Sequence, residues 1–213
     1  MERLPAVLAL DDLARIPLAE GIEYRPIRRP LGVTAFGINA YSADEGRVIE
    51  EHDELGSGSG KHEELYFVAT GHAKFVIDGT EHDAPAGTLL FVQPEQRRGA
   101  TAHAAGTTVL VIGGKPGAAG PPSPFEYWYF AGPLAEAGEP EKAYVIASEG
   151  LQHYPDNPGL QYNLACYAAL AGRREDALRH IRTAFELRPE SREWARDDAD
   201  LDLIRADIEH DLA

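Results

Sequence analysis

The sequence lacks several features that would define whole classes of protein. It has one cysteine, Cys166, so it forms no internal disulfide. Its first apolar run is broken by Asp11 and Asp12, which argues against a signal peptide, and no segment reaches the roughly 18 apolar residues of a membrane span. Basic residues are scarce: 20 Lys and Arg against 35 Asp and Glu give a net charge of −15. We therefore expect a cytoplasmic protein that binds neither nucleic acid nor a membrane.

A short segment without strand or helix signals divides the chain in two. Residues 116–123, PGAAGPPS, contain only Gly, Ala, Pro and Ser, the composition of a linker. The pattern of apolar residues differs on its two sides, which indicates an α+β protein of two domains. We predict a helical preface at 1–20, a β domain at 21–115, the linker at 116–123 and a helical domain at 124–213.

The segment before the linker carries strand signals. Short runs rich in Val, Ile, Phe and Tyr alternate with turn residues: VTAFGINAY, GRVIEEHDE, ELYFVATG, AKFVIDG, TLLFVQP and TTVLVIGG. Between two of these runs, Asp78-Gly79 is a strong hairpin signal because Gly takes positive φ at no steric cost. The pattern predicts an antiparallel β sandwich or barrel.

The segment after the linker contains an internal repeat with a period of 34 residues. Residues 124–157 align with 158–191, and the identities include small residues, a turn glycine (Gly138 and Gly172) and a proline after the second helix. This is the pattern of a helix-turn-helix repeat. It resembles the tetratricopeptide repeat (TPR), and the resemblance implies a surface for protein contacts or oligomerisation. We expect residues 192–212 to form a helical cap with Trp194 facing inward.

One stretch of the β segment has the spacing of a metal-binding motif. Gly46, His52, Glu54, Glu64 and Gly71 resemble the first motif of the cupin superfamily, G(x)5HxH(x)3–4E(x)6G, whose members have the RmlC-like jelly roll. The resemblance implies an antiparallel jelly-roll barrel whose His and Glu side chains bind a divalent metal. Here a glutamate replaces the second histidine, and the loop before Glu64 is longer by GSGSG.

The second cupin motif is altered at its metal ligand. That motif supplies one more histidine, from a segment of the form G(x)5PxG(x)2H. In GTLLFVQPEQRRGATA, Gly87 is in place, but Arg98 stands at the histidine position. Arginine stays protonated and is no ordinary metal ligand. The resemblance therefore carries the fold more firmly than the metal site.

Three interpretations of this cluster remain open. In one, His52, Glu54, His62 and Glu64 form a variant site for Mn, Fe or Zn, and the protein is a metal-dependent enzyme of dioxygenase or isomerase type. In another, Arg98 replaces the ion by pairing with Glu64 or Glu54 inside the barrel. In the third, the groups form a structural polar network in a dimerisation module.

The second interpretation leads to our main prediction. The β domain then binds a small molecule near Arg98, Tyr66, His62 and Glu64, with a degenerate metal site and no assured cofactor. The helical repeats dock a protein partner or a second copy, and we expect a homodimer. The sequence leaves open whether the protein is an enzyme.

Overall fold

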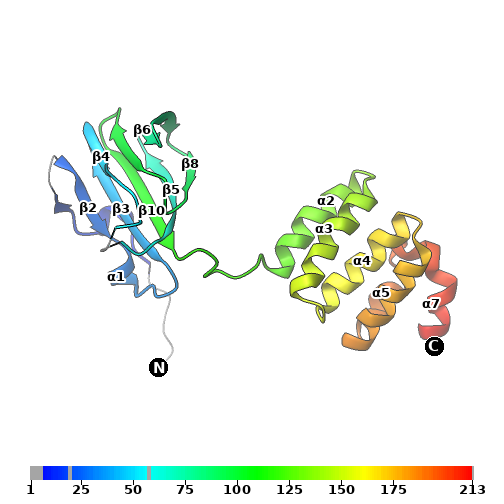
Figure 1. The fold of residues 1–213 in the computed structure, drawn as a ribbon. Helices are drawn as coiled ribbons and strands as arrows, with labels where there is room; N and C mark the ends of the chain where they lie inside the picture. The colour runs from blue at the N-terminus through cyan, green and yellow to red at the C-terminus, as the bar shows by residue number, and fades with distance from the viewer. Residues whose placement is uncertain (1–6, 19–20, 57–58, 213) are drawn as a thin grey trace, which may run out of the picture. The chain divides into compact units, whose positions relative to one another are not determined.

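The computed structural model describes residues 7–18, 21–56 and 59–212, without the side chains of 210–212. The chain divides into two compact units between Ala119 and Gly120, which lie inside the predicted linker. Figure 1 shows the strands in the first unit and the long helices in the second. Among the helices of the described ranges, none is long and apolar enough to cross a membrane.

The first unit contains two antiparallel sheets. In spatial order, the larger has β1 (Ile16–Pro17), β2 (Glu23–Pro26), β3 (Gly37–Ala43), β10 (Thr107–Gly114), β5 (Glu63–Thr70) and β8 (Leu89–Val92). The smaller has, also in spatial order, β4 (Gly46–His52), β9 (Arg98–Ala102), β6 (His72–Ile77) and β7 (Thr80–Pro85).

The two sheets form a sandwich, and the predicted closed barrel is wrong. One core joins Tyr66 and Val68 of the larger sheet to Phe75 and Ala100 of the smaller, as two inner faces do when they pack. No ladder among the described strands links one sheet to the other. The edge strand β1 contains Pro17, which has no N–H for a further ladder.

Two turns show why the sequence has glycine where it does. Asp78 and Gly79 have φ of 49° and 80° between the paired residues Ile77 and Thr80, so the predicted hairpin is confirmed. Gly71, the last glycine of the cupin-like motif, has φ of 74°. A Cβ there would lie 2.5 Å from Thr107 Oγ1, so glycine alone fits this turn.

The N-terminal preface is not the helix that we predicted. Its described part has one 3₁₀ turn, η1 (Leu10–Asp12), followed by the extended β1; residues 1–6 and 19–20 of the predicted segment lie outside the described ranges. Leu10 and Leu13 pack beside Ile38 and Leu110 on the outer face of the larger sheet, together with Leu31 of α1 (Arg28–Leu31). Three-residue spacing suits this single turn, and Pro17 keeps the next residues extended.

The second unit is built from two helical hairpins and a cap. The helices are α2 (Pro124–Glu136), α3 (Pro140–His153), α4 (Pro158–Leu170), α5 (Arg174–Leu187), α6 (Ser191–Ala195), η3 (Ala199–Ile204) and α7 (Arg205–Leu212). The starts of α2 and α4 are 34 residues apart, and so are those of α3 and α5, as the repeat predicted. Gly138 and Gly172 take φ of 79° and 75° in the two equivalent turns.

The cap differs from its prediction at one aromatic residue. Leu201 and Ile204 are fully buried, but Trp194 is 49% exposed, so its predicted inward orientation is wrong. Its ring lies edge-on to Tyr162, and the guanidinium of Arg188 is 5.5 Å from the ring centroid. A Trp residue seldom becomes fully buried because its ring is large.

Candidate ligand-binding site

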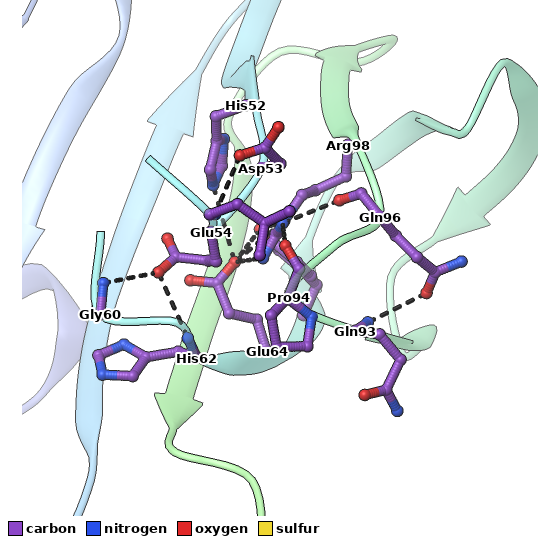
Figure 2. A network of polar contacts seen from close by, with 12 residues as sticks. His52, Asp53, Glu54, Gly60, His62, Glu64, Gln93, Pro94, Gln96 and Arg98 are labelled. Carbon is purple, nitrogen blue, oxygen red and sulfur yellow. Dashed lines mark hydrogen bonds and ion pairs between the residues drawn. The ribbon is translucent and has the colours of Figure 1, made fainter. Parts of the chain in front are cut away.

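Arg98 connects the two sheets across the interior of the sandwich. It is the first residue of β9, in register with His52 on β4 and Ile77 on β6. Its side chain crosses to Glu64, as Figure 2 shows. Glu64 and Tyr66 both point inward from β5 because the faces of that strand alternate. Arg98 is 0% exposed, and it is among the largest fully buried side chains of the described chain.

All three guanidinium nitrogens of Arg98 have acceptors. Nη2 donates to Glu64 Oε2 at 2.8 Å, and Nε contacts the same oxygen at 3.3 Å and the Tyr66 hydroxyl at 3.2 Å. Nη1 donates to the carbonyl oxygens of Gln96 at 2.9 Å and Pro94 at 3.4 Å. The predicted ion pair between Arg98 and Glu64 is therefore present.

The ion pair keeps Glu64 ionised. Burial alone would raise the pKa of Glu64, but hydrogen bonds from His52, Tyr66 and Arg98 outweigh it and lower the pKa to about 2. The Tyr66 hydroxyl donates to Glu64 Oε2 at 2.5 Å. Burial and the neighbouring carboxylate raise the pKa of Tyr66, so this phenol remains a donor.

His52 stands beside the same carboxylate with a defined tautomer. Its Nδ1 lies 2.7 Å from the carbonyl oxygen of Glu50, so Nδ1 carries a proton. Its Nε2 is 3.7 Å from Glu64 Oε2. The Glu64 carboxylate raises the pKa of His52, because a proton on Nε2 faces the negative charge. His52 and Glu64 can therefore present a donor and an acceptor side by side.

The other two predicted site residues lie differently from our expectation. Glu54 falls beyond the end of β4, and its Oε2 accepts from the backbone N–H of Gly60 at 3.0 Å and of His62 at 3.5 Å, which closes the loop. His62 precedes β5, and its ring occupies the space above Gly60. Figure 2 shows the His62 ring turned away from the Glu64 carboxylate.

A cavity of about 250 Å³ opens onto His52 and Glu64. Its polar groups come from Glu50, His52, Glu64 and Tyr66. The rest of the wall is mostly apolar and is formed by Leu18, Ile22, Tyr41, Val48, Ile49 and Val111. Arg98 and His62 do not line it. Sequence reasoning missed the apolar walls, because Leu18, Ile22 and Val48 have no signal that separates a cavity wall from a packed core.

The residues fit a divalent metal poorly. Ligand atoms of His52, Glu54 and Glu64 lie within 4.8 Å of one another, so a candidate group exists, and His62 is not in it. However, Glu64 Oε2 already accepts from Arg98 and Tyr66, and the permanent charge of Arg98 lies 2.8 Å from that oxygen. An ion bound there would face a buried guanidinium, and one Glu54 oxygen already serves the loop backbone.

Comparisons with known proteins give likenesses in structure only. No family model matches the chain, and no curated protein matches it. KdgF from a Halomonas species is 15% identical with a TM-score of 0.42 and covers 51% of this chain and 91% of its own. An RmlC-like cupin from Shewanella frigidimarina is 18% identical with a TM-score of 0.38, covering 48% and 85%.

A third similar structure is a sugar phosphate isomerase of the cupin superfamily from Silicibacter pomeroyi. It is 20% identical with a TM-score of 0.42, covering 52% of this chain and 76% of its own. Likenesses at this level say nothing about activity. The chemistry of this chain must come from its own site.

Proposed function

We propose that the first unit binds a small organic molecule in the cavity beside His52 and Glu64, without a divalent ion. The observation that carries this proposal is the saturated Arg98–Glu64 pair, which puts a fixed cation close to where the cupin resemblance implies a metal. The pair holds Glu64 ionised at the polar end of an otherwise apolar cavity. Arg98 acts as a positioning residue, because it is fully buried and does not reach the cavity.

The charges around the cavity favour an uncharged ligand with a hydroxyl group. The carboxylates of Glu50 and Glu64 line the cavity and disfavour an anion, and the guanidinium of Arg98, 2.8 Å from Glu64 Oε2, disfavours a cation. Glu64 Oε1 accepts no hydrogen bond from any other described residue. A ligand hydroxyl can donate to Oε1 and accept from His52, while its apolar body contacts Ile49 and Val111.

The size of the cavity limits the ligand further. Its volume is about 250 Å³. This is below the usual 300–1,000 Å³ of drug-sized pockets, so the proposed ligand is a single-ring molecule. For the second unit we keep the sequence-based proposal of a TPR-like surface that docks a protein partner or a second copy.

Elemental analysis tests the metal-free part of the proposal. The full chain would be purified without chelators from cells supplied with Mn, Fe and Zn. We expect less than stoichiometric metal, with no loss on substitution of His52. A stoichiometric transition metal that disappears in His52→Ala would instead establish the metal-dependent enzyme.

Thermal-shift screening with uncharged, hydroxylated single-ring compounds tests the ligand. Hits should stabilise the wild-type chain and lose their effect in His52→Ala. His72→Ala is the matched control, because the His72 side chain is equally exposed, at 39% against 36%, but pairs with Asp83 outside the cavity. Ligands that stabilise both variants equally, or a preference for anions over neutral compounds, would contradict the proposal.

A further inference from the structure

The four edges of the two sheets differ in how well they resist pairing with another chain. An edge strand presents unpaired N–H and C=O groups, and proteins guard such edges with charges, proline, bulges or short length. The edges of this sandwich are β1 and β8 of the larger sheet and β4 and β7 of the smaller. Three of them carry proline, charged residues or shifts of register, and β8 carries none of these.

The three protected edges each carry identifiable devices. Strand β1 is two residues long and ends in Pro17. Strand β7, with sequence TEHDAP, exposes Glu81 and Asp83. Strand β4 carries Arg47 and two glutamates, and its ladder with β9 shifts register twice.

Strand β8 is four residues long, but it carries no charge, proline or bulge. Its sequence is Leu-Leu-Phe-Val, its ladder with β5 is regular from Phe67↔Leu89 to Glu64↔Val92, and no charged residue occurs between Asp83 and Glu95. Figure 1 shows β8 at the rim of the first unit, next to β5.

An apolar surface accompanies this open edge. Leu89 and Phe91 point out of the sandwich and are 62% and 55% exposed, while Leu90 and Val92 point into it. The residues paired with them on β5, Phe67 and Leu65, continue the same face and are half-buried. Farther from β8, the same outer face is already covered by Leu10, Leu13, Ile27 and Leu31.

We propose that β8 pairs antiparallel with β8 of a second copy of this chain, about a two-fold axis. The two larger sheets then form one continuous sheet, and Leu89 and Phe91 of each copy contact their counterparts. This pairing gives the free backbone N–H and C=O groups of β8 hydrogen-bond partners, and it buries the exposed side chains of Leu89 and Phe91. It is independent of the ligand site, which faces the interior of the sandwich.

The charge of the chain favours a second copy as the occupant. A two-fold interface brings the same surface of both copies together, so it must be self-complementary. Two chains of net charge −15 repel each other over most of their surfaces, and residues 84–94 are an uncharged exception. A different protein attracted by the negative charge of this chain would carry basic residues. Those residues would find no carboxylate on β8 to pair with.

The mass of the full chain in solution tests this interface. By light scattering after gel filtration, we expect twice the 23.2 kDa of one chain, and a single-chain mass for the variant Leu89→Lys/Phe91→Lys. Val76→Lys is the matched control, because Val76 is also an exposed apolar strand residue, 40% exposed, but lies on β6 between two partners. It should keep the double mass.

The remaining outcomes are equally decisive. A wild-type mass of 23.2 kDa, or a double variant that stays dimeric, overturns the proposal. If the double variant does not fold, hydrogen exchange of the wild-type chain decides instead. Amides of β8 should then exchange more slowly than those of the protected edge β7, and exchange as fast as in β7 would refute the pairing.

Discussion

The two units of this protein each bury a polar network. One is built on an ion pair and is called the charged network, and the other is built on an uncharged imidazole and is called the neutral network. In the first unit, Arg98 and Glu64 join two sheets through an ion pair whose oxygen Oε2 also accepts from Tyr66. In the second unit, His180 of α5 joins α3 and α4 through Tyr144 and Gln161. The first network joins strands that are distant in the sequence, and the second joins three consecutive helices.

The neutral network depends on one protonation state of His180. Its Nδ1 lies 2.7 Å from Gln161 Oε1 and so donates to this amide oxygen. This leaves Nε2 to accept from the Tyr144 hydroxyl at 3.1 Å and from Arg179 Nη2 at 3.3 Å. Burial, and then the charge of Arg179, lowers the pKa of His180 to about 4. A proton on Nε2 would break the bond from Tyr144.

Both networks hold neighbouring elements together, but substitution disrupts one more readily and acid the other. A buried ion pair is costly to break by substitution, because the remaining charge has no partner. A buried neutral imidazole is instead sensitive to acid, because the unfolded chain takes up a proton that the folded chain rejects. Changes at Arg98, His180 and Tyr66 separate these two behaviours.

Removing Arg98 should have the largest effect. Arg98→Met leaves the Glu64 carboxylate buried without its cation, and we expect the first unit to lose about 3–5 kcal/mol of unfolding free energy. Both Trp residues, Trp128 and Trp194, lie in the second unit, so hydrogen exchange of β5 and β9 measures this loss.

Two further variants control for this result. Arg97→Ala removes the adjacent, largely exposed arginine that pairs with Glu51, so it should cost much less than Arg98→Met. Arg98→Met with Glu64→Gln should recover part of the loss, because no charge is then left buried. If Arg97→Ala and Arg98→Met lowered the unfolding free energy equally, the buried ion pair would contribute no more to stability than the exposed one.

The second unit should lose stability in weak acid. The folded pKa of His180, about 4, is below the ordinary 6.5. Stability is therefore complete above pH 6.5 and falls by about 3 kcal/mol as the pH drops to 4, at about 1.4 kcal/mol for each pKa unit. Urea unfolding followed by Trp fluorescence measures it.

Substitution separates this histidine from the others. His180→Gln should flatten the pH dependence, whatever it costs in absolute stability. His153→Gln, at an exposed position on α3 of the same unit, should leave the dependence unchanged. A wild-type chain whose stability is level from pH 6.5 to 4 would mean that His180 is not held neutral.

Local sequence patterns predicted much of this fold. Alternation of apolar residues located most strands of the sandwich, and the 34-residue period located both helical hairpins. The pattern failed where tertiary contacts decide: the apolar residues before β2 were expected to form a helix, but Leu10 and Leu13 need only one turn to reach the sheet. Trp194 failed for a similar reason, because spacing alone does not tell a core face from a solvent face.

The candidate site was predictable in its charges but not in its geometry. Arg98 at the histidine position of a cupin-like motif indicated a buried ion pair, because a buried guanidinium requires a carboxylate partner. Glu54 was expected on the strand beside His52. It left the strand because the loop backbone at Gly60 needed an acceptor, a need that the spacing of the motif does not show.

Removing one hydroxyl should have the smallest of the three effects and test the charged network most finely. Tyr66→Phe removes the donor 2.5 Å from Glu64 Oε2 and an acceptor for Arg98 Nε, and we expect the unfolding free energy to fall by about 2 kcal/mol.

The same change should alter the response to acid. With one donor fewer, the pKa of Glu64 rises from about 2 toward 4.5. A carboxylate whose pKa is lowered in the folded chain stabilises the fold at pH values above its pKa in the unfolded chain. This contribution is lost as the pH falls through its pKa in the folded chain. The acid transition of the first unit should therefore move to higher pH in Tyr66→Phe, as measured by hydrogen exchange of β5. Tyr24→Phe, which removes a hydroxyl that donates to Asn39 at 2.8 Å instead, should leave that transition where it is. If Tyr66→Phe also leaves it in place, Arg98 alone keeps Glu64 ionised.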